Sequence, residues 1–179
     1  GGNMYVPCPG DASQWKCCLT VVIATVRLAE RWRTGIVIAP RVCCGRPAIS
    51  KGMLARAAEQ AATATRKLLP LARRGLSIVF CEPSCYSAVV DDHPHLQRGA
   101  AKSEAEEVAA ACVTLEQWAE SALERNGGAL SGLTSATARR ILLHGHCHQK
   151  ALVGTGAAEQ LLAKMPNCEV TVLDSGCCG

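Results

Sequence analysis

The feature that most constrains this 179-residue chain is a Cys-Cys-Gly motif that occurs twice. The first copy, residues 43–45, follows the run Ile-Val-Ile at 36–38, and the second copy, residues 177–179, follows a similar run at 170–173. Because β-branched residues favour strands, we expect each motif in the loop that directly follows a strand. Ligands of open α/β sheets bind beyond the carboxyl ends of the strands, so the sequence predicts chemistry in these loops.

A further cysteine precedes each motif by about one strand–helix unit. Cys8 lies 35 positions before Cys43, and Cys147 lies 30 positions before Cys177. The chain is therefore expected to contain two related βαβ-type cysteine-rich repeats. The first covers residues 1–126, a Gly/Ser/Thr-rich linker covers 127–138, and a second, truncated repeat covers 139–179.

Alternating strand-like and helix-like segments predict the order βαβαβα, a linker, then βαβ. Strands are expected near 4–6, 36–39, 76–80, 141–143 and 169–173, and helices near 13–33, 51–73 and 103–124. After the fourth strand, a short helix and a second helix are expected, with a break near Gly154 or Gly156 and an end at Met165. The fold class is α/β, with a mostly parallel sheet covered by helices on both faces. In detail, 36–39 is expected to be a buried strand, Ser50 to cap a helix that Pro70 kinks or ends early, and 91–99 to be an irregular polar segment whose two histidines lie at the surface.

The composition separates two explanations for the twelve cysteines. Small secreted domains use disulfides because they lack a core, whereas 49% of this chain is hydrophobic. The cysteines also cluster beside Gly, Pro and His, a spacing typical of metal or cluster ligation in a cytosolic protein. The formal net charge is +4, but the arginines are scattered without interleaved aromatics, so no nucleic-acid partner is expected.

The remaining sequence signals concern location. The longest apolar run, near residues 21–26, is too short to span a bilayer, and no signal peptide is visible at the N-terminus. We expect a cytoplasmic protein without a transmembrane segment, or one that reaches a membrane through a partner. The absence of an initiator Met suggests a fragment or a processed chain.

In the first repeat, five cysteines follow strands and converge if those strands are neighbours. They are Cys8, Cys43, Cys44, Cys81 and Cys85. Adjacent cysteines fit poorly into one tetrahedral zinc site but suit a multinuclear iron–sulfur cluster, in which each thiolate binds a different iron. Glycines and prolines nearby leave room for backbone N–H groups to hydrogen-bond the sulfurs.

In the second repeat, the candidate thiols are Cys147, Cys177 and Cys178. His144, His146 or His148 could complete a metal site, and a mixed Cys/His set would favour zinc. Alternatively, these histidines orient the loop or conduct protons.

The other cysteines have simpler interpretations. Cys17, Cys18 and Cys112 fall on or beside apolar helical stripes and are expected in the core, and Cys168 is expected to be structural or incidental. Neighbouring cysteines could also form a redox disulfide, but no Cys-x-x-Cys stands at a helix start, so a thioredoxin-like activity is not expected.

Four stretches of this chain carry a resemblance to a known family. They are Cys43-Cys44-Gly45-Arg46-Pro47-Ala48-Ile49-Ser50-Lys51-Gly52, Glu82-Pro83-Ser84-Cys85-Tyr86, His144-Gly145-His146-Cys147-His148-Gln149-Lys150-Ala151 and Asp174-Ser175-Gly176-Cys177-Cys178-Gly179. On these residues the chain resembles the CCG-type cysteine-rich domain of the glycolate oxidase iron–sulfur subunit, the anaerobic glycerol-3-phosphate dehydrogenase C subunit and the heterodisulfide reductase B subunit. The likeness is closest to the C-terminal iron–sulfur part of FAD-linked oxidases acting on D-lactate or D-2-hydroxyglutarate.

The resemblance implies an electron-transfer domain of a flavin-dependent 2-hydroxy acid oxidoreductase, with FAD on a partner domain or subunit and a separate electron acceptor. It implies a [4Fe–4S]-type cluster on Cys8, Cys43, Cys44 and Cys85, with Cys81 a weaker candidate because the closing pair has one extra residue between its cysteines. It implies zinc or a second cluster at the second repeat. The chain alone is not expected to oxidise a hydroxy acid. A disulfide-reducing domain like the heterodisulfide reductase B subunit, and a binding module held by zinc, remain alternatives.

Overall fold

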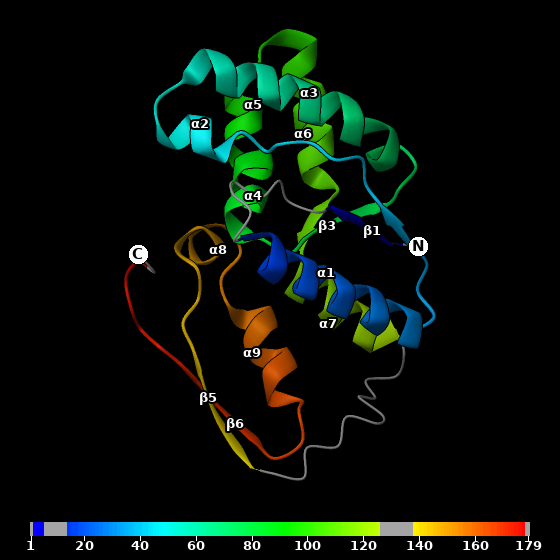
Figure 1. Cartoon of the computed structure of the whole chain (residues 1–179), viewed down its shortest axis with the longest axis vertical. Helices are drawn as coiled ribbons and strands as arrows, with labels where there is room; N and C mark the ends of the chain where they lie inside the picture. The colour runs from blue at the N-terminus through cyan, green and yellow to red at the C-terminus, as the bar shows by residue number, and fades with distance from the viewer. Residues whose placement is uncertain (1, 6–13, 126–137, 178–179) are drawn as a thin grey trace. The chain divides into compact units, whose positions relative to one another are not determined.

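The computed structural model describes residues 2–5, 14–125 and 138–177, with side chains from residue 21 onward (Figure 1). The chain divides into two compact units, Gly1–Leu115 and Glu116–Gly179. The predicted boundary at 126 stays a prediction, and the predicted linker lies outside the described residues except for Ala138. All strand pairs of the described residues are parallel, which confirms the α/β class.

The first unit contains a parallel sheet in the order β2-β1-β3-β4. Its strands are β1 (Gly2–Tyr5), β2 (Ile36–Ile38), β3 (Ser77–Phe80) and β4 (Cys112–Thr114). β1 lies between β2 and β3, pairing Gly2 with Ile36 on one side and with Ser77 on the other. Parallel strands end at a common edge, so the loops after β2 and β3 leave the sheet at the same edge. The strands expected to carry the first cysteine site are therefore close together.

The helices of the first unit provide most of its core. They are α1 (Gln14–Arg31), α2 (Arg46–Ser50), α3 (Leu54–Ala72), α4 (Pro83–Ser87), the π-helical turn η1 (Ala88–Asp92), α5 (His93–Leu96) and α6 (Gly99–Ala110). α3 packs against α6, and the alanines of its buried face, Ala57, Ala61 and Ala64, are at most 1% exposed. Small side chains let these helices approach closely, which suits a chain with 3% aromatic residues.

The predicted helix over 103–124 is wrong in the middle. The structure ends α6 at Ala110, forms β4, and starts α7 at Leu115 (Leu115–Arg125). β4 pairs with β3 in the register Ile78↔Cys112, and it contains the β-branched Val113 and Thr114. Pairing with a buried strand outweighs a helical periodicity that continues on both sides. Cys112 is nevertheless buried, as its assignment to the core requires.

Three further expectations are corrected. β2 is an edge strand rather than a buried one, with Val37 53% and Ile38 61% exposed. Ser50 ends α2 instead of capping a long helix, because the chain turns at Gly52, whose φ of +69° favours glycine, before α3 begins. α3 also continues through Pro70 to Ala72, where the last helical turn tolerates the loss of one N–H.

The segment 91–99 is helical rather than irregular at its start. α4, η1 and α5 follow one another without a break, so the chain remains helical from Pro83 to Leu96. π-helical turns occur frequently at functional sites, where they change the direction of the side chains that follow.

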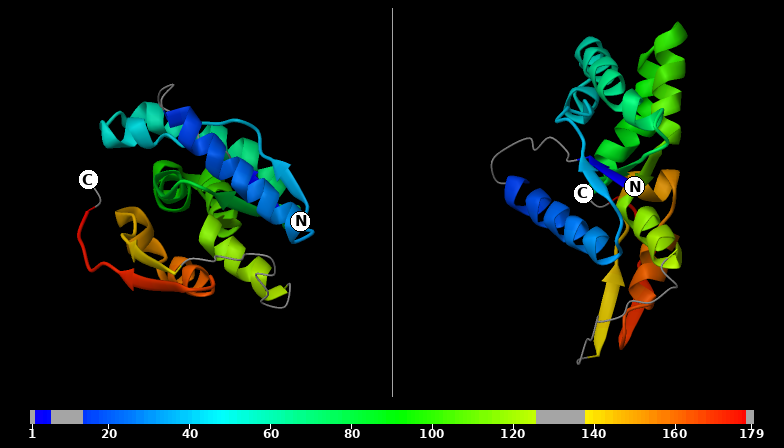
Figure 2. Two further views of the ribbon diagram at one scale, coloured as in Figure 1. Left: turned by 60° about the horizontal axis from the view of Figure 1, so that its bottom comes forward. Right: turned by 90° about the vertical axis from the view of Figure 1, so that its right-hand side faces the viewer.

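The second unit contains a βαβ arrangement, as expected for the second repeat. It comprises β5 (Arg139–Leu143), α8 (Cys147–Leu152), α9 (Gly156–Ala163) and β6 (Cys168–Val172), after α7. β5 and β6 pair in parallel, and α9 packs on β6 (Figure 2). In the described part of the chain, no helix combines the length and the apolar character that crossing a membrane requires.

Candidate functional site

Three of the predicted thiols come together at the carboxyl edge of the first sheet. Cys44 lies in the loop after β2 and Cys85 lies in α4 after β3, and their sulfurs are 3.0 Å apart. Both are buried, with 2% and 7% of their surface exposed. Cys43 hydrogen-bonds the Cys44 thiol and is half-buried. The strand order β2-β1-β3 thus joins residues separated by 41 positions.

The other two predicted ligands of this site are placed differently. Cys81 is half-buried just after β3, with its sulfur 4.0 Å from the hydroxyl of Thr25. Cys8 lies outside the described residues. The roles of both cysteines stay predictions.

The buried thiols favour their protonated forms. The hydrogen bond from Cys43 lowers the pKa of Cys44, but the hydrogen bond with Cys85 and burial outweigh it and raise that pKa to about 12. For Cys85 the hydrogen bond with Cys44 lowers the pKa, while burial and the nearby Glu82 carboxylate produce a net rise. Thiolate ligands must lose these protons, so metal binding here releases protons to solvent.

Glu82 fixes the start of α4 and therefore the position of Cys85. Its carboxylate accepts hydrogen bonds from the backbone N–H groups of Ser84, at 2.9 Å, and Cys85. Burial alone would raise the pKa of Glu82, but these N–H donors lower it below its ordinary value. An ionised N-cap also interacts favourably with the helix dipole.

The loop after Cys44 is tied to α4 and η1 by Arg46. Its guanidinium donates to Ser87 Oγ at 3.0 Å and to the carbonyl of Ser84 at 3.4 Å, and it forms an ion pair with Asp92. Its backbone N–H hydrogen-bonds the Cys44 sulfur. The turn between Cys44 and Arg46 is made by Gly45 at φ +81°, a conformation that glycine adopts at no steric cost.

His93 is a site residue that sequence reasoning placed wrongly. It was expected at the surface but is 1% exposed, and its Nε2 lies 2.8 Å from the carbonyl oxygen of Cys44. The helical segment that carries His93 begins at Pro83, so no helix-start signal stands beside this residue. No pattern in the neighbouring sequence indicates that His93 is buried. His95 is exposed, as expected.

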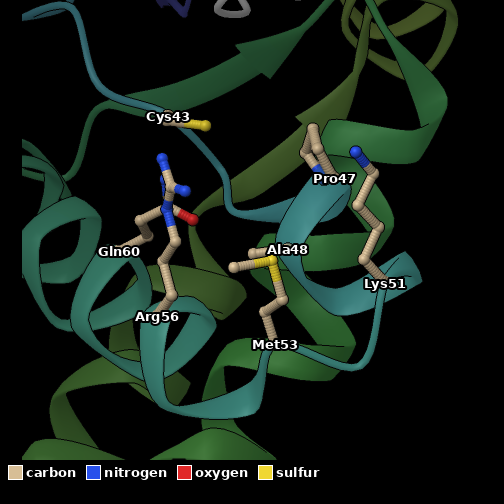
Figure 3. Close-up of a pocket in the computed structure, with 7 residues that line it drawn as sticks. All are labelled: Cys43, Pro47, Ala48, Lys51, Met53, Arg56 and Gln60. Atoms are coloured by element: carbon tan, nitrogen blue, oxygen red, sulfur yellow. The ribbon is translucent and has the colours of Figure 1, made fainter.

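A cavity of about 290 Å³ adjoins this cluster and is bordered by Cys43 (Figure 3). Its other lining residues are Pro47, Ala48, Lys51, Met53, Arg56 and Gln60. Figure 3 shows the Arg56 side chain extending from α3 toward Cys43. Two cations, Lys51 and Arg56, line this cavity, whereas a second cavity that also borders Cys43 is lined by Glu59 as well as by Arg41 and Lys67.

The second site is more open. Cys147 begins α8, and its sulfur lies 3.9 Å from that of the exposed Cys177. His146 caps α8 through Nδ1, which accepts from the backbone N–H of His148 at 3.3 Å, and the two imidazole rings are 5.4 Å apart. His144 is exposed, and Cys178 lies outside the described residues.

The loop carrying Cys177 is held by Lys150 of α8. The ammonium group donates to the carbonyl of Gly176 at 2.8 Å and to that of Ser175. Gly145, before the histidine cap, is buried so closely that an added Cβ would overlap the Thr155 methyl group. A larger residue at this position would have to displace the Thr155 side chain.

The donor atoms fit a thiolate-bound cluster in chemistry, although the described residues hold no group of three or more His, Cys, Asp or Glu side chains in ready metal-binding geometry. Three soft sulfur donors converge in the first site, and a backbone N–H already donates to one of them. Such N–H···S contacts are typical of iron–sulfur sites. The second site offers two described thiols beside two imidazoles, a set that suits zinc equally well.

Comparison with known proteins points to one component of a dehydrogenase. No known family model and no solved structure matches the chain. The chain is similar to the C subunit of anaerobic glycerol-3-phosphate dehydrogenase from Escherichia coli strains K12 and O157:H7, at 25% identity over 156 residues in each case. The similarity covers 86% of this chain but 38% of each relative, so the chain spans well under half the length of these relatives. Among the proteins that its motifs resemble, this C subunit is the one that the comparison supports.

Proposed function

We propose that this chain is an iron–sulfur electron-transfer part of a flavin-dependent dehydrogenase. The observation that carries the proposal is the 3.0 Å contact between the buried sulfurs of Cys44 and Cys85, with Cys43 bonded to the first of them. The contact shows that the fold brings these thiols to one place, and a bound cofactor would separate them, because two sulfurs on one tetrahedral metal at about 2.3 Å lie farther apart than this. The similarity to the C subunit of a dehydrogenase supports an electron-transfer role.

In this proposal, Cys43, Cys44 and Cys85, with Cys8 and in second place Cys81, hold a [4Fe–4S]-type cluster, which supplies one-electron transfer when bound. The residues around the cysteines position them and keep water away. Glu82 orients Cys85, Arg46 ties the Cys43–Gly45 loop to α4, and burial excludes water from two of the sulfurs. Cys43, which is half-buried and borders the cavity, is reachable from solvent.

The proposed partners are a flavin-containing domain or subunit and a separate electron acceptor. The finer form of the proposal makes the parent enzyme an oxidoreductase of 2-hydroxy acids such as lactate, glycolate or 2-hydroxyglutarate. The similarity to a component of a glycerol-3-phosphate enzyme extends the candidates to a phosphorylated polyol. Both substrate classes are small hydroxylated anions whose oxidation delivers electrons to a flavin.

The second site is proposed to hold zinc or a second cluster on Cys147, Cys177 and Cys178, with His146 or His148 as an added ligand. The support is the closeness of the Cys147 and Cys177 sulfurs, 3.9 Å, beside the two imidazoles.

The test is to measure iron, acid-labile sulfide and zinc per chain after anaerobic purification, with an EPR spectrum of the reduced protein. About four iron and four sulfide per chain, the content of one [4Fe–4S] cluster, are expected for the first site. Zinc without iron or sulfide would contradict the redox role and leave a zinc-held module. A chain that binds neither metal after anaerobic reconstitution would contradict the proposal as a whole.

A further inference from the structure

The strongest unassigned feature is the buried imidazole beneath the first cysteine loop. His93 is 1% exposed, and burial lowers its pKa, with the hydrogen bond to Cys44 opposing that shift only in part. A carbonyl oxygen can only accept, so Nε2 carries the hydrogen and donates it to Cys44 across 2.8 Å. The imidazole is therefore a fixed donor aimed at the backbone of a candidate ligand.

A second contact set acts on the same loop. Arg46, two residues after Cys44, reaches Ser84 and Ser87, which flank Cys85, and pairs with Asp92, the residue before His93. The side chains of Arg46 and Asp92 are only 18% and 26% exposed, so water screens their attraction less than that of a surface pair. The contacts of both His93 and Arg46 join the Cys44 loop to the helical segment that carries Cys85.

The π-helical turn η1 gives this arrangement its geometry. η1 occupies Ala88–Asp92, between Cys85 and His93, and its wider turn rotates the residues that follow relative to an α-helix. Asp92 and His93, adjacent in sequence, thereby contact Arg46 and Cys44 respectively.

We propose that His93 and Arg46 form a latch that fixes the Cys43-Cys44-Gly45 loop against α4 before a cofactor binds, and that His93 is a positioning residue for the Cys44 sulfur. The inference rests on the proposed iron–sulfur function for its electrochemical consequence, but the latch itself belongs to the metal-free chain. With the Cys44 carbonyl held by His93 and the Arg46 side chain held by Asp92, the backbone N–H of Arg46 stays on the Cys44 sulfur. Donation of this kind stabilises the more negative, reduced form of a cluster.

The first experiment uses the metal-free chain and measures how fast iodoacetamide alkylates Cys44, identified by peptide mass spectrometry. His93→Leu removes the donor and leaves the buried Cys44 carbonyl without this partner, so the loop should open more often. Alkylation of Cys44 should therefore accelerate about tenfold, which corresponds to about 1.4 kcal/mol. His93→Gln keeps an N–H donor of similar reach and should restore protection, and His95→Leu, at an exposed position, should change nothing.

The second experiment uses the reconstituted chain and measures the midpoint potential and EPR line shape. His93→Leu and Arg46→Gln should shift the potential to lower values and alter the line shape, whereas His93→Gln should stay near the wild type. Arg73→Gln, which breaks an exposed ion pair with Glu107, is the matched control for the arginine change.

Several outcomes would overturn the latch. If His93→Leu had the same Cys44 alkylation rate and the same midpoint potential as the wild type, His93 would contribute only packing. If that variant does not fold, His93→Asn, a polar side chain too short to reach the Cys44 carbonyl, is compared with His93→Gln, and equal behaviour of the two would also reject the proposal. If the wild type holds no cluster, the alkylation series still tests the latch, so failure of the proposed function and failure of the latch are distinguishable.

Discussion

The two cysteine sites share a motif but differ in how the protein supports them. In the first unit, Cys44 and Cys85 are buried with sulfurs 3.0 Å apart, and Glu82, Arg46 and His93 position them through backbone and side-chain contacts. In the second unit, the exposed Cys177 lies 3.9 Å from Cys147, and one lysine holds its loop. The same motif can thus be held by several side-chain contacts or by few.

The difference follows from the sheets. The first motif leaves a four-stranded sheet whose β3 is buried by helices, whereas the second leaves a two-stranded pair. A two-stranded sheet is only marginally stable without further packing. We therefore expect the first site to be preformed and the second to depend more on its metal for order.

The largest expected effect separates the sites directly. Cys44→Ser should abolish iron and sulfide binding in the first unit while leaving metal at Cys147 and Cys177 unchanged, because each unit provides its own ligands. The measurement is metal content per chain with EPR. Cys112→Ala is the control, since its buried thiol donates to the carbonyl of Val108. Equal metal loss in both variants would contradict the assignment of Cys112 to the core.

Gly145→Ala tests the packing of the second unit. The added methyl group would overlap the side chain of Thr155, and overpacking of this kind costs about 1–3 kcal/mol. Hydrogen exchange of the β5 and β6 amides should accelerate accordingly. Thr155→Ser removes the opposing methyl group and should rescue the variant. Gly156→Ala, which meets no atom within 4 Å, should be neutral, and an equal effect at both glycines would reject the packing argument.

Lys150→Met tests how far Lys150 organises the second site. Loss of the hydrogen bonds to Ser175 and Gly176 should weaken zinc binding about tenfold, at the lower end of what outer-shell contacts contribute. Competition titration with a chelator measures the affinity. Lys164→Met, at an exposed position outside these contacts, is the control. An unchanged affinity would mean that the hydrogen bonds of Lys150 are not needed to hold the loop.

Glu82 gives the smallest effect and a pH dependence. Its folded pKa lies below the ordinary 4.5, so its contribution to stability is complete above that value and disappears as pH falls through the folded pKa. Glu82→Gln should destabilise the metal-free first unit by about 1 kcal/mol at pH 7, in line with the loss of an N-cap. The variant should also lose part of the acid sensitivity of unfolding below pH 4.5. If the wild type and Glu82→Gln lost the same stability as the pH falls, Glu82 would not be the origin of the acid sensitivity.

The sequence was sufficient where local pattern decides the structure. Cysteines after strands predicted that five thiols converge if those strands are neighbours, and three of them, Cys43, Cys44 and Cys85, do meet. The sequence was insufficient where contacts with residues far along the chain decide the structure. β4 forms at Cys112–Thr114 only because β3 offers an edge for pairing, and His93 is buried only because the π-helical turn directs it to the Cys44 carbonyl. Neither partner is visible within a window of neighbouring residues.

The position of β1 has a consequence for the order of events during synthesis. β1 is made before β2 and β3, yet it pairs with both, and the partners of its Gly2 are Ile36 and Ser77. This interior strand of the sheet must wait for both neighbours, and such non-local parallel pairing forms slowly. Cys44 therefore meets Cys85 only after β3 and α4 have left the ribosome. If the first site binds a cofactor as proposed, Cys44 and Cys85 can hold it together only at this late stage.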